Sequence, residues 1–180
     1  KNIEETRDLG LKDGGKEVVD FALNMISTTS KSTYYRKLAA LMKDMTKDKK
    51  IVVKTGRITN NKGEVVKGNY ESSNGTTTIS VNTDSNSYPM GMNELDLEES
   101  LLHELVHSVS IDSYNKGKTL MNQGKAGVAI TTIIVSLDNL FADYQKRVKE
   151  LKAQGLADNI PSNSTKDIYE FISELFTNQD

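Results

Sequence analysis

Apolar side chains recur with helical spacing in several parts of the chain. Residues 14–46 carry two such patterns, and Ser30 or Ser32 is placed to cap the second helix. Residues 124–154 carry a longer apolar stripe, and the last pattern covers roughly residues 165–178. These spacings predict a helical N-terminal part and a helical C-terminal part.

Short β-favouring runs lie between these helical parts. The runs are Ile51–Thr55, Glu64–Lys67 and Thr76–Asn82, and Asn, Gly and Ser separate them. Residues 60–63 and 72–75 contain the Asn and Gly residues that tolerate a positive φ, so both are predicted hairpin turns. The expected sheet is small and mainly antiparallel, which gives an α+β fold class.

A further helix is expected after this sheet. Asp96 followed by Glu99 resembles a capping box, which would start the helix near Leu97 and let it run to about Ser110. With 180 residues, of which 36% are apolar, the chain has enough apolar residues for one core. Residues 1–180 are therefore expected to form a single domain, which could be a fragment of a longer protein.

The composition excludes several classes of chemistry. The chain has no cysteine, which removes disulfides, cysteine-based metal sites and thiol nucleophiles. A net charge of −2 gives no reason to expect a nucleic-acid partner. The longest apolar stretch, residues 128–137, is too short to span a membrane, and no signal peptide is visible. The compartment stays undetermined.

The only two histidines of the chain lie four residues apart, in the sequence His103-Glu104-Leu105-Val106-His107. On a helix this spacing puts both imidazoles on one side, and Glu104 lies about 100° from His103 and about 60° from His107. The alternative is a helix with two surface histidines that bind metal adventitiously. Against it, the apolar residues of this helix fall on the opposite side: Leu101, Leu102, Leu105, Val106 and Val109.

A catalytic zinc ion needs a third protein ligand, which without another histidine or a cysteine must be a carboxylate. The best candidate segment is residues 170–176, because Glu170 and Glu174 share one helical stripe beside an apolar face. Glu174 is the predicted ligand. Glu170 and Asn178, one turn before and after it, are candidates to orient the histidines, or else face solvent.

Residues 101–108 resemble the active-site helix of the zincin metallopeptidases whose third ligand is a glutamate, the gluzincins. Residues 170–176, Glu-Phe-Ile-Ser-Glu-Leu-Phe, are similar to the corresponding segment of peptidase domains related to anthrax lethal factor, found in toxins and phages. The resemblance implies a zincin-like fold, with a central metal helix and a C-terminal helical part. It also implies Zn²⁺ bound by His103, His107 and Glu174, and Glu104 as the general base that takes a proton from water.

Some features of that family are not matched. Its tyrosine seven residues before the ligand glutamate corresponds to Asp167, so the group that stabilises the oxyanion is unassigned. Tyr169 falls on the packed side of its helix, and Tyr114 and Tyr144 qualify only if folding brings them to the site. The run Thr76–Asn82 takes the position of an edge strand that pairs with an extended substrate, or else is an interior strand.

The leading interpretation is a zinc metallopeptidase, an endopeptidase rather than an exopeptidase, acting on a protein or peptide substrate. The alternative is a non-catalytic zincin-like binding or structural module of a larger toxin or phage protein. A third reading gives residues 124–154 the role of a partner surface in a toxin accessory domain. Retention of Glu104 argues against the alternative, since a structural zinc site has no use for a general base.

Overall fold

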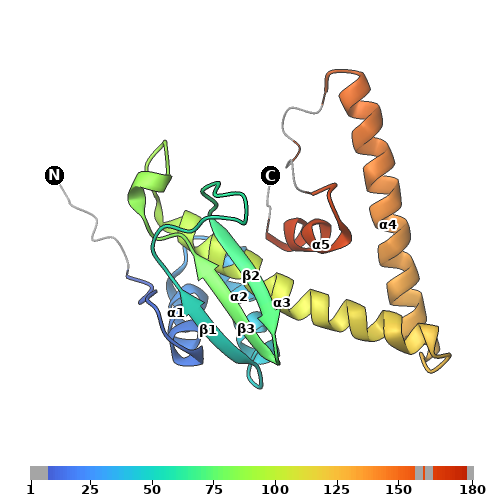
Figure 1. Cartoon of the computed structure of the whole chain (residues 1–180), viewed down its shortest axis with the longest axis horizontal. Coiled ribbons are helices and arrows are strands. Elements are labelled where there is room, and N and C mark those ends of the chain that lie inside the picture. Colours follow the sequence, from blue (N-terminus) through green and yellow to red (C-terminus); the bar gives the residue numbers. More distant parts are fainter. Residues whose placement is uncertain (1–7, 157–159, 161–163, 178–180) are drawn as a thin grey trace. The chain divides into compact units, whose positions relative to one another are not determined.

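The computed structural model describes residues 8–156, 160 and 164–177, and Figure 1 shows the order of its elements along the chain. It contains five α-helices and a small three-stranded mixed sheet, so the predicted α+β class is confirmed. The chain divides into two compact units, Lys1–Ser108 and Val109–Asp180, and each is described by itself. The expectation of a single domain and the zincin-like architecture stay predictions.

Two helices form the N-terminal part of the first unit. α1 (Lys16–Thr29) packs against α2 (Thr33–Met45) and against the first strand of the sheet. Ser32 is the N-cap of α2, where its hydroxyl accepts a hydrogen bond from the Tyr35 backbone N–H at 3.1 Å. Both helices and this cap agree with the prediction from the sequence.

The sheet consists of β1 (Lys50–Lys54), β2 (Gly68–Ser73) and β3 (Thr76–Val81), in the order β1-β3-β2. β3 is parallel to β1 and antiparallel to β2, so the expected mainly antiparallel sheet is in fact mixed. The β2–β3 hairpin turns at Asn74 and Gly75, which both have a positive φ (50° and 77°), as a two-residue hairpin turn requires.

The run Thr76–Asn82 had two readings, an edge strand or an interior strand, and the structure shows the second. β3 lies in the middle of the sheet, and β1 and β2 are its two edges. The run Glu64–Lys67 is not one of the three strands, but its Val65 forms an isolated antiparallel bridge with Thr59. The bridge closes the turn predicted at residues 60–63, where the Asn60 N–H donates to the Glu64 carbonyl at 2.9 Å. The hairpin register fixes β2 at residues 68–73, and this polar segment has no apolar alternation that would reveal it.

α3 (Glu94–Asn122) is longer than predicted at both ends. Its capping box is Asn93 with Asp96, not Asp96 with Glu99. The Asp96 N–H donates to Asn93 Oδ1 at 3.0 Å, and the Asn93 N–H donates to Asp96 Oδ2 at 2.8 Å. The helix also continues beyond Ser110 through a polar segment that carries little hydrophobic periodicity.

The second unit contains the C-terminal part of α3, α4 (Val128–Ala153) and α5 (Ile168–Thr177). α3 and α4 approach closely at Gly117, where an added Cβ would lie 2.8 Å from the Ile134 side chain. Phe171 of α5 packs between Phe141 and Tyr144 of α4, with ring centroids 5.4 and 4.9 Å away. None of the helices in the described ranges is long and apolar enough to cross a membrane.

Candidate metal site

The two histidines lie on one side of α3, as their spacing predicts. Their ring centroids are 4.8 Å apart, and the two ring planes meet at 77°. The opposite side of the helix is packed into the core, where Leu101, Leu102 and Leu105 are completely buried. The helix is therefore held by its apolar side while its other side presents two imidazoles.

Glu104 is buried, with 7% of its surface exposed, and its carboxylate lies against the start of strand β2. A Cβ added at Gly68 would be 2.9 Å from Glu104 Oε1 and 3.0 Å from Glu104 Cγ. Real side chains do not approach this closely, so the glycine leaves the space that the Glu104 side chain occupies. The Glu104 carboxylate is therefore buried on the same helix as the two imidazoles, one position after His103 and three before His107.

Strand β2 also contacts His107. The Tyr70 ring stacks against the His107 ring, with centroids 6.2 Å apart and planes 16° from parallel. Since alternate residues of a strand point to the same face, Gly68 and Tyr70 both face α3. Sequence reasoning missed Tyr70, because a single tyrosine in a polar segment carries no signal of its own.

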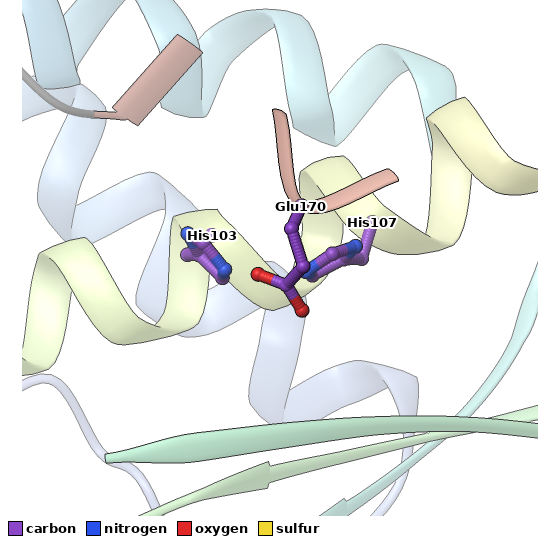
Figure 2. A group of neighbouring side chains, drawn as sticks. All are labelled: His103, His107 and Glu170. Atoms are coloured by element: carbon purple, nitrogen blue, oxygen red, sulfur yellow. The ribbon is translucent and has the colours of Figure 1, made fainter. Parts of the chain in front are cut away.

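A third candidate ligand comes from helix α5. One ligand atom from each of His103, His107 and Glu170 lies within 4.8 Å of the other two, and Figure 2 shows the three side chains turned toward one another. Two imidazoles and one carboxylate form a donor set that can hold a metal ion.

The predicted ligand Glu174 is outside this group of three, which was identified among the described residues. Glu174 lies one turn further along α5 and is half-buried. Its role as a ligand stays a prediction, whereas Glu170, expected to orient a histidine, is grouped as a ligand. Asn178, the other residue expected to orient a histidine, lies outside the described residues.

The three tyrosines considered for oxyanion stabilisation form their hydrogen bonds with other residues of the second unit. Tyr114 donates to Asp138, the hydroxyls of Tyr144 and Ser164 lie 2.8 Å apart, and Tyr169 donates to Asn115 at 2.6 Å. Each hydroxyl thus has a partner on or near helices α3 to α5. The Tyr169 ring also packs edge-on against the Tyr114 ring, with centroids 5.8 Å apart, as expected of the packed side of its helix.

The chain was also compared with protein-family models, with curated proteins and with solved structures, and nothing matches it in any of the three. The case for a function therefore rests on the residues of the site.

Proposed function

We propose that this chain is a zinc-dependent metallopeptidase of zincin-like fold that hydrolyses peptide bonds as an endopeptidase. The observation that carries the proposal is the grouping of His103 and His107 with a carboxylate, beside the buried Glu104. Both histidines of the chain lie on this one helix face. A structural zinc site would fill all four positions with protein ligands and would not need an additional glutamate between its histidines.

The chain's own residues divide the work as follows. His103, His107 and Glu170 would hold the ion, and the zinc ion, when bound, would acidify a water molecule and polarise the scissile carbonyl. The Glu104 carboxylate accepts a proton from water as the water oxygen attacks the carbonyl carbon, and then donates this proton to the nitrogen of the leaving amine. The burial of Glu104 keeps bulk water away from this proton.

The sheet offers a place for the substrate. β2 is one of the two edge strands of the sheet, and its residues Gly68 and Tyr70 contact Glu104 and His107. An extended peptide that pairs with the outer edge of β2 would run past these two site residues. We therefore give this role to β2, since β3, which the sequence offered for it as one of two readings, is the interior strand.

The first experiment measures metal content and cleavage. The purified protein and its Glu104→Gln variant are tested for bound metal and for cleavage of a peptide library. The proposal predicts stoichiometric zinc in both proteins and cleavage by the unsubstituted protein alone. Glu99→Gln, an identical change at an exposed position of the same helix, is the control and should cleave normally.

Several outcomes would overturn the proposal. Zinc in both proteins with cleavage by neither would favour the non-catalytic module. Iron in place of zinc would point to the oxygen chemistry that two histidines and one carboxylate also support. Cleavage that survives Glu104→Gln would exclude Glu104 as the general base.

The third ligand needs its own test, because the sequence predicts Glu174 whereas the structure groups Glu170 with the histidines. The two residues are one helical turn apart, so Glu170→Ala and Glu174→Ala are matched variants of each other. Loss of a group that only orients a metal ligand weakens metal binding by about 10- to 100-fold. We therefore expect Glu170→Ala, which removes a ligand itself, to weaken zinc binding by more than about 100-fold, and Glu174→Ala to weaken it by much less. The reverse order in a chelator competition assay would identify Glu174 as the ligand.

A further inference from the structure

We propose that Tyr70 of strand β2 is a positioning residue that fixes the plane of the His107 imidazole; the inference rests on the proposed metal site. The two rings are nearly parallel, 16° apart, and their centroids are separated by 6.2 Å. This is the geometry of an offset aromatic stack. The His107 ring thus has the parallel ring of Tyr70 beside it, and the steeply inclined ring of His103 with its centroid 4.8 Å away.

Such a contact is useful because a histidine ring is not fixed by its backbone. The torsion that turns the imidazole about its Cβ–Cγ bond has broad, roughly two-fold preferences, so a helix position alone does not aim the ring nitrogen. A metal ligand must present that nitrogen with little angular error. A flat ring parallel to the imidazole blocks its rotation, and this function needs the ring of Tyr70.

Tyr70 is itself held firmly. It pairs with Ile79 of β3, which is completely buried and lies in the central strand of the sheet. Two residues earlier on the same strand face, Gly68 contacts Glu104. One strand therefore contacts both the general base and a metal ligand of the proposed site, and its position is set by the sheet and not by a loop.

The test compares two substitutions of Tyr70 with a control on the same strand. Tyr70→Phe keeps the ring, whereas Tyr70→Leu removes it and retains apolar bulk. Asn69→Ala, at an exposed neighbouring position whose side chain points to the other face, is the control. Far-UV circular dichroism and thermal unfolding first establish that the variants fold.

The first measurement needs no metal. Because the chain has only two histidines, the metal-free protein gives two imidazole Cε1–H signals, which a His107→Ala variant assigns. Loss of the Tyr70 ring current should shift the His107 signal at fixed pH in Tyr70→Leu, while Tyr70→Phe and Asn69→Ala leave it nearly in place. An unmoved His107 signal in Tyr70→Leu would overturn the inference whether or not the protein binds zinc.

The second measurement is metal binding. Zinc affinity is measured by competition with a chelator, and the ligand geometry is monitored by the visible absorption spectrum of the Co²⁺-substituted protein. We expect Tyr70→Leu to weaken binding by about 3- to 10-fold, the range that an aromatic pair supports, and to alter the cobalt spectrum. Tyr70→Phe should match the unsubstituted protein, and a loss in Tyr70→Phe as large as in Tyr70→Leu would contradict a role for the ring. A shifted His107 signal in a protein that binds no metal would instead retain the stacking role and refute the proposed function.

Discussion

Replacement of Gly68 by alanine tests how closely the sheet and helix α3 are fitted together. The new methyl group would lie 2.9 Å from Glu104 Oε1, 3.0 Å from Glu104 Cγ and 3.2 Å from the Ser80 carbonyl oxygen. Ordinary contacts of this kind begin at about 3.4 Å, so something must move by about 0.5 Å. Since the Ser80 oxygen belongs to the backbone of β3, the Glu104 side chain is the part that gives way.

The size of the effect follows from this displacement. Overpacking of this kind costs about 1–3 kcal/mol of unfolding free energy, which for a chain of this length lowers Tm by about 2–12 °C. Displacement of a catalytic group by 1 Å costs about 100-fold in rate, so we expect kcat to fall by about 10- to 100-fold. Zinc content should not change, because the methyl group meets neither histidine.

The assay is peptide cleavage together with thermal unfolding, in a double-mutant cycle with Glu104→Ala. If the methyl group acts through Glu104, then Gly68→Ala should lower the free energy of unfolding when Glu104 is present and should lower it much less in the Glu104→Ala background. Gly127→Ala, where an added Cβ meets nothing within 4 Å, is the control for activity. Equal losses of stability in both backgrounds, or unchanged cleavage by Gly68→Ala, would refute the reasoning.

Three further predictions concern stability. Leu105→Ala, at a completely buried position of α3, should cost about 2–5 kcal/mol in urea unfolding; a loss below about 1 kcal/mol would contradict its core position. Zinc at 100 times its Kd should add about 2.7 kcal/mol and raise Tm, and chelation or His107→Ala should remove the gain. Although burial acts to raise it, the pKa of Asp138 is lowered, because Lys118 and Tyr114 donate hydrogen bonds to its carboxylate. A lowered folded-state pKa means that ionised Asp138 stabilises the folded chain. This stabilisation is fully present above the unfolded pKa of about 3.9 and is lost as pH falls through the lower folded pKa. On acidification, the Tm of Asp138→Asn should therefore fall less than the Tm of the unsubstituted protein.

The predictions that the structure corrects have two physical origins, one local and one tertiary. The sequence predicts the capping box three residues late because Asp96 is itself a strong N-cap residue. Its backbone N–H is instead bound by Asn93, which starts the helix earlier. β2 was missed because its pairing with β3, and not its own composition, makes it a strand. The parallel pairing of β1 with β3 was missed because the order of strands depends on contacts distant in sequence.

The sequence by itself determined the histidine pair, the glutamate between them and the apolar side of their helix. These follow from the 3.6-residue repeat, a local property that any helix imposes on side chains three and four positions apart. Only the tertiary structure decided which strand lies at the edge, which carboxylate is grouped with the histidines and which residues flank Glu104 and His107. Gly68 is 36 residues from Glu104 in the sequence, and Tyr70 is 37 residues from His107. Glu170 is 63 residues from His107. At such separations, strand register and helix packing decide which side chains meet, and neither is encoded in a local pattern.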